Sequence, residues 1–157
     1  MSAMPEKGDL APDFRGITHT GEAASLADFR GQYVALYFYP EDDTLLCTRQ
    51  ACNLRDNYNS LMDAGIAIIG VSRDDVESHD AFVNKFGLPF PLIADPDKAI
   101  MSAYGTWGQK NMYGNLVTGT KRTTFLIDPG GVIAHVFRRP KTGNHAAEIL
   151  KRMPAAA

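Results

Sequence analysis

Hydrophobic and polar residues follow two different periods near the centre of the chain, and the change of period predicts a strand–helix–strand unit. Residues 33–39 are apolar on both faces and too few for a helix, so they predict a buried central strand. From residue 44 to 64 the apolar positions recur every three or four residues, which predicts one long helix closed by Gly65. Residues 66–71 predict a second buried strand. Over this length the two strands are expected to be parallel, with a right-handed crossover.

The remaining elements are shorter, and most are bounded by Gly, Pro, Asn or Asp. They are expected as a hairpin over 14–18 and 23–26, a helical turn over 25–31, a helix from Asp74 or Asp75 to Gly87, an edge-like strand within 88–94, a helix over 98–104, a hairpin joining 123–128 to 132–137, and a last helix over 145–153 before a frayed tail.

One stretch carries no regular pattern. Residues 106–120 are polar and contain glycines, so they predict a loop without structure of its own, and loops of this length are often functional. Its large side chains, Trp107, Met112 and Tyr113, are expected to anchor the loop or to line the mouth of a site.

The order of elements predicts an α/β fold of the thioredoxin-like class. It comprises a central mixed sheet flanked by helices, with an N-terminal extension. The late hairpin and C-terminal helix distinguish this pattern from a doubly wound sheet. Without an internal repeat or linker, residues 1–157 are expected to form a single domain.

Composition narrows the function classes. The chain is 45% hydrophobic and 22% charged, as in globular proteins. A net charge of −2 without a Lys/Arg-rich cluster argues against binding nucleic acid. The start of the chain lacks the apolar core of a signal peptide, and no run is long enough to span a membrane. We therefore expect a soluble, cytoplasmic protein that does not bind membranes, in a compartment where structural disulfides are rare.

The two cysteines of the chain, Cys47 and Cys52, lie where the central strand gives way to the long helix. At a helix N-terminus the backbone N–H groups and the helix dipole favour the thiolate of Cys47 over the thiol. The acidic residues 41–43 oppose this effect unless they point to solvent, so a nearby arginine would help. Thr44 can place a hydroxyl beside the sulfur, and Pro40 can limit the access of water.

The spacing of the cysteines bears on how they can react. Five helical positions place the Cα atoms of Cys47 and Cys52 about 8–9 Å apart and about 140° round the helix axis. A disulfide requires Cα atoms within about 7 Å. The pair cannot bond while the helix is intact. Either Cys52 is a buried structural thiol, or oxidation unwinds this helical turn.

Several motifs resemble those of a known family. Pro40-x-x-x-Thr44-x-x-Cys47 is similar to the P-x-x-x-T-x-x-C signature of peroxiredoxins. A second cysteine five positions on resembles the peroxiredoxin Q, or bacterioferritin comigratory protein, subfamily. The resemblance covers nearly the whole chain and includes Ala11-Pro-Asp-Phe14, Ala51-Cys-Asn-Leu-Arg-Asp56, Gly70-Val-Ser72, Gly87-Leu-Pro-Phe-Pro91, Tyr104-Gly-x-Trp107-Gly, Met112-Tyr-Gly114 and Arg122-x-Thr-Phe-Leu-Ile-Asp128.

The resemblance implies a role for each matched residue. Cys47 would be the peroxidatic nucleophile and Cys52 the resolving thiol, while Thr44 and Arg122 hydrogen-bond the thiolate and peroxide and Pro40 shields the site. Cys47 would become a sulfenic acid, condense with Cys52 to a disulfide, and be recycled by thioredoxin or a similar dithiol. No metal or organic cofactor would be needed, and an intramolecular resolving cysteine favours a monomer.

The chain departs from the subfamily just before the nucleophile. A glycine usually precedes this cysteine there, whereas Leu45-Leu46 does so here. Two leucines make the site mouth more apolar and restrict the loop, which bears on peroxide preference and on local unwinding.

Each candidate residue also has a structural interpretation. Cys52 can be inert, with Cys47 acting alone in a one-cysteine mechanism. Thr44 can serve as an N-cap without a catalytic role, Arg122 can pair with a surface carboxylate, and Pro40 can simply end a strand. The four histidines form no i,i+4 pair and are expected to be superficial or structural, which argues against a zinc site and a Cys–His hydrolase.

Two other functions compete with a thiol peroxidase. A thioredoxin-like disulfide oxidoreductase is opposed by the missing C-x-x-C motif and by Arg122-Thr123, where a proline would precede the late strand. A non-catalytic redox sensor would use the same cysteine pair as a switch. Peroxide consumption that depends on Cys47 separates these functions.

Overall fold

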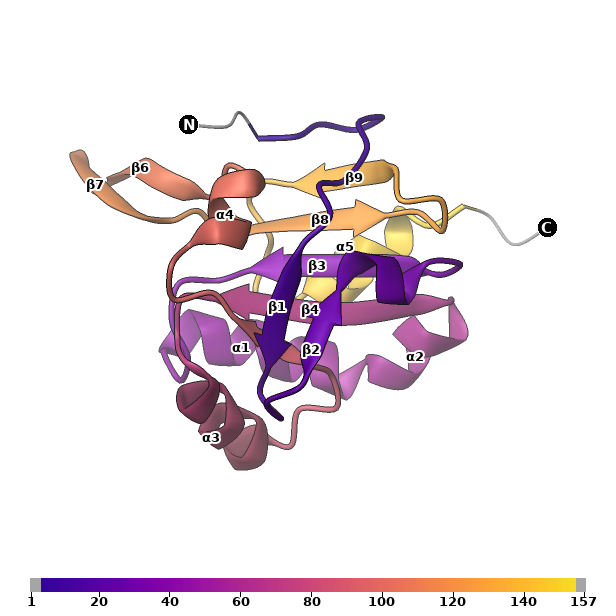
Figure 1. The fold of residues 1–157 in the computed structure, drawn as a ribbon, viewed down its shortest axis with the longest axis horizontal. Coiled ribbons are helices and arrows are strands. Elements are labelled where there is room, and N and C mark those ends of the chain that lie inside the picture. Colours follow the sequence, from indigo (N-terminus) through magenta and orange to yellow (C-terminus); the bar gives the residue numbers. More distant parts are fainter. Residues whose placement is uncertain (1–3, 155–157) are drawn as a thin grey trace.

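A seven-stranded mixed sheet forms the centre of the computed structural model, which describes residues 4–154 (Figure 1). Its spatial order is β2-β1-β5-β4-β3-β8-β9. The strands are β1 (Arg15–Thr18), β2 (Ala23–Ser25), β3 (Tyr33–Phe38), β4 (Ile66–Ser72), β5 (Leu92–Ala94), β8 (Thr123–Ile127) and β9 (Ile133–Phe137). β3 pairs in parallel with β4 and antiparallel with β8, so the predicted strand–helix–strand unit and its central position are confirmed.

Helices cover both faces of this sheet. One face packs against α1 (Leu45–Asp56), α2 (Tyr58–Asp63), α3 (Val76–Phe86) and α5 (His145–Lys151). The other packs against the 3-10 helix η1 (Leu26–Phe29) and the short α4 (Ala99–Ala103). Ala35 and Tyr37 of β3 belong to the first core, and Val34 and Leu36 to the second, which explains why this strand is apolar on both faces. Among residues 4–154 no helix is long and apolar enough to span a bilayer.

The predicted long helix over 44–64 is wrong in one respect, because it breaks at Asn57 into α1 and α2. The Asn57 side chain donates to the Asn53 carbonyl oxygen at 2.9 Å, and the Asn57 backbone N–H reaches the same oxygen at 3.2 Å. Asn57 has φ −110° and ψ 16°, outside the helical range. A side-chain amide that binds backbone locally competes with the helical hydrogen bonds, and here it ends the first helix.

The edge-like strand expected within 88–94 is also corrected. β5 lies inside the sheet, parallel to β4 on one side and antiparallel to β1 on the other. Both prolines of the stretch, Pro89 and Pro91, precede the strand and so remove none of its own N–H donors. Only the pairing of Ile17 with Ala94, which are distant in sequence, makes this strand interior.

The stretch 106–120 is a hairpin rather than a loop. β6 (Trp107–Met112) pairs antiparallel with β7 (Asn115–Thr120) outside the main sheet, and Figure 1 shows the pair projecting from one end of the molecule. Tyr113 and Gly114 form its two-residue turn with φ of 53° and 84°, as a primed hairpin turn requires. Most of β7 is exposed, so the alternation that would have predicted a half-buried strand is missing.

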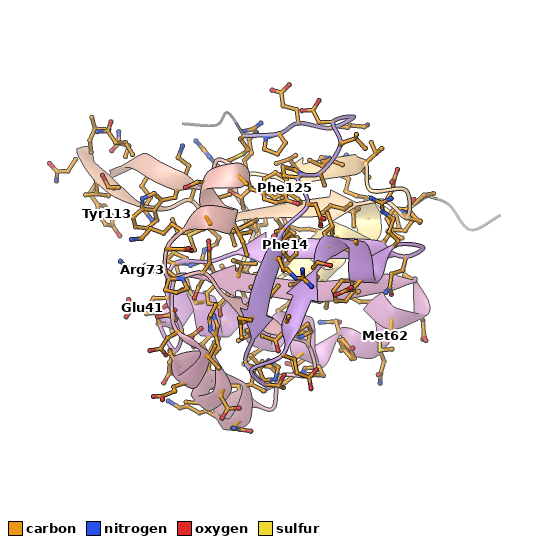
Figure 2. The ribbon with its side chains drawn as sticks, viewed as in Figure 1. Phe14, Glu41, Met62, Arg73, Tyr113 and Phe125 are labelled. Carbon is orange, nitrogen blue, oxygen red and sulfur yellow. The ribbon has the colours of Figure 1, made fainter. Side chains whose placement is uncertain are left out.

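The large side chains of this hairpin have different surroundings. Trp107 sits at its base, with Lys98 Nζ 4.7 Å from the ring centroid, and packs against the second core, so it is an anchor as expected. Tyr113 projects at the tip and is 99% exposed, so it anchors nothing within the chain (Figure 2). The side chain of Met112 lies outside the described part of the structure, as do residues 155–157 of the expected tail.

Other predicted boundaries are confirmed. Asp75 caps α3, its carboxylate accepting from the Ser78 N–H at 2.8 Å, and Gly87 ends the helix with φ 62°. The early hairpin forms between β1 and β2, and the late hairpin between β8 and β9.

The buried His145 generates a prediction about pH and stability. Burial lowers its pKa below 6.5, and Thr124 Oγ1 and Glu148 Oε1 lie 2.8 and 3.0 Å from its ring nitrogens. The folded state therefore favours the neutral ring, whereas the unfolded chain takes up a proton near pH 6.5. We expect the free energy of unfolding to fall as pH decreases below 6.5, at up to about 1.4 kcal/mol per pH unit from this residue.

Urea unfolding at pH steps from 7.5 to 5 measures this dependence. His145→Asn should lower stability at pH 7.5 but flatten the decline below pH 6.5. An unchanged slope in the variant would assign the pH dependence to other groups, such as His19 and His135, whose pKa values burial also lowers.

Candidate functional site

The site lies at the end of the central strand, where β3 leads through residues 39–44 into α1. Cys47 is the third residue of α1 and only 2% exposed, and its sulfur faces the core between α1 and the sheet. The predicted placement of Cys47 at a helix N-terminus is therefore confirmed. The first N–H groups of a helix have no partner within the helix, so they can interact with a nearby negative charge. Glu41 and Arg73, which follow the C-terminal ends of β3 and β4, appear at the same edge of the molecule (Figure 2).

Arg122 approaches Cys47 from 75 residues away in sequence. It directly precedes β8, the antiparallel neighbour of β3. Its Nη2 donates to Cys47 Sγ at 3.3 Å, and its Nη1 donates to Gln50 Oε1 at 2.7 Å. A guanidinium that donates to sulfur stabilises the thiolate over the thiol. The predicted proximity of Arg122 to the nucleophile is present in the structure.

Gln50 is a site residue that the sequence reasoning missed. It is fully buried, three residues after Cys47, on the same face of α1. Its Oε1 accepts from Arg122, and its Nε2 has no hydrogen-bond partner among the described residues. The available signal was a polar residue at a position where helical periodicity calls for an apolar one.

Tyr37 and Lys110 were missed as well. The Tyr37 hydroxyl is buried without a hydrogen-bond partner among residues 4–154, and burial first, then the charge of Cys47, raises its pKa well above 10. It therefore stays protonated. Burial and then the charge of Arg122 lower the pKa of Lys110, on β6, while the charge of Cys47 opposes them. The hairpin thus brings a second cation to this side of the molecule.

Two carboxylates of the acidic run contact residues of α3. Asp42 Oδ2 lies 2.7 Å from His79 Nδ1, and Asp43 Oδ2 accepts from Lys85 Nζ at 2.6 Å. Glu41 is exposed. The cations and hydrogen-bond donors in these contacts offset part of the negative charge of residues 41–43, which the sequence led us to expect would disfavour a thiolate at Cys47.

Thr44 and Pro40 differ in part from expectation. Thr44 is the N-cap of α1 by backbone conformation, yet its hydroxyl caps no N–H of the helix and donates instead to the Glu41 carbonyl at 2.9 Å. The expected donation from this hydroxyl to Cys47 is therefore not made in this arrangement. Pro40 is half-buried at the end of the central strand, where it can contribute to a shield.

Cys52 lies on the same uninterrupted helix as Cys47, and both are free thiols. It is half-buried rather than sealed in the core. Because α1 is continuous from Leu45 to Asp56, the helical spacing of the two cysteines applies, and they cannot bond without local unwinding.

A group of possible metal ligands lies nearby but is already satisfied. Asp42, Asp74 and His79 hold ligand atoms within 4.8 Å of one another, the one such group among residues 4–154. Asp74 Oδ2 accepts from the Asp42 N–H and from Ser72 Oγ, and both ring nitrogens of His79 have partners. The structure thus explains the cluster as a hydrogen-bond network.

Comparisons with known proteins agree with this geometry. Residues 7–136 match the model of the AhpC/TSA family. The chain is 44% identical to a putative peroxiredoxin bcp of Coxiella burnetii, covering 94% of this chain and 98% of that relative. It is 43% identical to peroxiredoxin Bcp of Escherichia coli, over 91% and 92% of the two chains. A structure of Xanthomonas campestris bacterioferritin comigratory protein, described for its alkyl peroxide reduction activity, superposes with a TM-score of 0.84 at 33% identity, covering 98% and 97%.

The Gln50–Arg122 contact generates a prediction about the reactivity of Cys47. Gln50→Leu removes the acceptor that orients the guanidinium, so we expect alkylation of Cys47 by iodoacetamide at pH 7 to slow by about tenfold. Gln50→Glu keeps an acceptor oxygen and should retain most of the rate.

Mass spectrometry in a Cys52→Ser background measures alkylation at Cys47 alone, and Arg122→Gln sets the scale of the full loss. Equal rates for Gln50→Leu and the parent protein would show that Arg122 keeps its position without Gln50.

Proposed function

This chain belongs to the AhpC/TSA family as a peroxiredoxin of the Bcp, or peroxiredoxin Q, subfamily, and on that premise we propose a catalytic cycle for its two cysteines. The chain is a thiol peroxidase, and membership confirms the predicted thioredoxin-like fold. In the proposed cycle Cys47 is the peroxidatic nucleophile and Cys52 the resolving thiol. The observation that supports the first role most strongly is the 3.3 Å contact between Arg122 Nη2 and Cys47 Sγ.

In the first step the Cys47 thiolate attacks one oxygen of the peroxide. The S–O bond forms as the O–O bond breaks, and the departing oxygen takes a proton and leaves as water or an alcohol. Cys47 is oxidised to a sulfenic acid while the peroxide is reduced. Arg122 balances the negative charge on sulfur and on the peroxide oxygens. Thr44 assists when its hydroxyl turns from Glu41 toward the peroxide, and Pro40 limits access of water.

In the second step Cys52 resolves the sulfenic acid. The first turn of α1 unwinds, the Cys52 sulfur attacks the Cys47 sulfur, and water leaves as the disulfide forms. Leu45 and Leu46 are 74% and 48% exposed, so this turn has few apolar contacts to lose before Cys47 itself moves. A one-cysteine cycle that uses Cys47 alone remains the alternative.

In the third step an external dithiol of the thioredoxin type reduces the disulfide by thiol–disulfide exchange. The dithiol is oxidised to a disulfide, which accounts for the two electrons that the peroxide received. We assign hydrogen peroxide and organic hydroperoxides as substrates. A monomer is sufficient for this cycle because both cysteines lie on one helix. The cytoplasmic location expected from the sequence stays a prediction.

A thiol peroxidase consumes peroxide rapidly through Cys47, whereas a disulfide oxidoreductase or a redox sensor does not. With hydrogen peroxide or an alkyl hydroperoxide and dithiothreitol as reductant, the wild-type protein should consume peroxide rapidly, and Cys47→Ser should abolish this activity. Stopped-flow measurement decides the matter. Peroxide consumption that is slow, or that persists in Cys47→Ser, would favour a disulfide oxidoreductase or a redox sensor.

Cys52→Ser tests the resolving role separately. The first oxidation step should remain fast, because the Arg122 guanidinium donates to Cys47 and Gln50 and not to Cys52, whereas no intramolecular disulfide can follow. Mass spectrometry under non-reducing conditions should find a Cys47–Cys52 bond in oxidised wild-type protein. Its absence there would leave the one-cysteine cycle.

Leu46 provides a third test, aimed at the unwinding step. Glycine costs up to about 1 kcal/mol in a helix relative to good helix formers, so Leu46→Gly should accelerate disulfide formation by roughly three- to fivefold. Leu46→Ala removes the same apolar contacts but keeps helix propensity, and it serves as the matched control. Equal acceleration in both variants would attribute the effect to lost packing rather than to the helix.

A further inference from the structure

A buried polar cluster holds the loop before the nucleophile against α3. Asp42 lies at its centre, with only 9% of its surface exposed. Its Oδ1 accepts from the Tyr39 hydroxyl at 2.6 Å, and its Oδ2 accepts from Ser78 Oγ at 2.8 Å and lies 2.7 Å from His79 Nδ1. We call Asp42, Tyr39, Ser78 and His79 the loop clamp.

His79 is held on both sides. It is fully buried, and its Nε2 lies 3.0 Å from the carbonyl oxygen of Ile93 in β5. Because a carbonyl can only accept, Nε2 carries a proton. A single hydrogen bond between Nδ1 and Asp42 Oδ2, 2.7 Å long, holds the other side of the ring. The clamp therefore links the loop, α3 and the central sheet through a connected set of hydrogen bonds, and hydrogen bonds are stronger in the buried, low-dielectric interior than in water.

The backbone of the same loop is tied independently. The Asp42 N–H donates to Asp74 Oδ2 at 2.8 Å, and Asp74 also accepts from Ser72 Oγ at 2.7 Å. Asp43 has φ 57°, a left-handed conformation that is uncommon for a residue other than glycine, and it pairs with Lys85 of α3. Residues 42 and 43 are thus fixed from two directions, while Leu45 and Leu46 directly after them are exposed.

We propose that the Asp42–His79 pair is the fixed end of the segment that rearranges during catalysis. It positions the loop for reaction with peroxide and confines unwinding to residues after Asp43. This inference rests on the proposed function, in which the first turn of α1 unwinds so that Cys52 can reach Cys47. Neither Asp42 nor His79 hydrogen-bonds either cysteine or Arg122, so their role is one of positioning.

Conformational entropy explains how the Asp42–His79 pair can affect the rates of Cys47 oxidation and disulfide formation without touching either cysteine. If residues 42 and 43 stay fixed, few residues gain freedom when Cys47 leaves its helical position. If the anchor is removed, the whole loop gains freedom, which favours the unwound form. The reactive folded form becomes less populated, and the form that makes the disulfide becomes more populated.

The experiment compares two rate constants in the full-length protein. Quenched-flow mass spectrometry measures the oxidation of Cys47 by hydrogen peroxide and the formation of the Cys47–Cys52 bond. His79→Leu should raise the ratio of disulfide formation to oxidation by about tenfold. Overoxidation to sulfinic acid should then require more peroxide. Asp42→Asn should act in the same direction, and the double variant should add little to His79→Leu, because one pair is being removed.

Three further variants separate positioning from general stability. His79→Asn keeps a donor near the place of Nδ1 and should restore most of the wild-type ratio. Ser78→Ala removes one weaker bond to Asp42 and should shift the ratio by about two- to threefold even if His79→Leu does not fold. Tyr104→Phe removes a partly buried hydrogen bond from Tyr104, in the other core, to the Pro12 carbonyl, and it should lower stability without changing the ratio.

The outcomes are distinct. A wild-type protein that forms no Cys47–Cys52 bond overturns the resolving role of Cys52, and with it the clamp proposal that rests on this role, while a one-cysteine peroxidase remains. If the bond forms but the ratio is unchanged in His79→Leu and Ser78→Ala, the clamp alone is overturned. An equal change in Tyr104→Phe would likewise overturn it, because the effect would then follow stability.

Discussion

The contact between Arg122 and Cys47 depends on the antiparallel pairing of β3 with β8. In that register Phe38 opposes Thr123, so Arg122 emerges beside the end of the central strand, where α1 begins. A slip of one residue would turn the arginine to the opposite face of the sheet and leave the sulfur without its cation. The register is held by Leu36, Phe38 and Phe125 in one core and by Leu126 in the other. The geometry of the proposed catalytic site is therefore a consequence of sheet packing.

In the proposed cycle, the helix that carries both cysteines has two conflicting tasks. Its N-terminus supplies the electrostatic environment that favours a thiolate, and Arg122 adds to it only while Cys47 stays in its helical place. The proposed disulfide can form only when that place is abandoned. The structure contains features that suit both tasks. Gln50 and the buried side of α1 hold the folded form, while the exposed Leu45 and Leu46 leave the first turn weakly packed.

Two buried polar groups near Cys47 lack hydrogen-bond partners among the described residues. The Tyr37 hydroxyl and Gln50 Nε2 are both buried without hydrogen-bond partners among residues 4–154. Such groups cost about 1–3 kcal/mol each in stability, so they are uncommon in a well-packed core. Gln50 lies one helical turn from Cys47, and the charge of Cys47 contributes to the shifted pKa of Tyr37. Both unpaired groups thus lie near Cys47 rather than elsewhere in the described core.

By itself, the sequence determined the local features of this protein. Residues 33–39 and 66–71 are apolar on both faces, which predicted the two central strands. The spacing of Cys47 and Cys52 showed that a disulfide between them cannot form in an intact helix. These features follow from burial and helical geometry within a few turns of chain. The tertiary structure alone decided which distant segments meet. It brought β1 beside β5, paired the exposed strands of the 106–120 hairpin, and turned Asp42 and Asp43 toward α3. It also placed Gln50 against an arginine that only family resemblance had singled out. Periodicity reports whether a residue is buried, but the partner of a buried polar group comes from elsewhere in the chain.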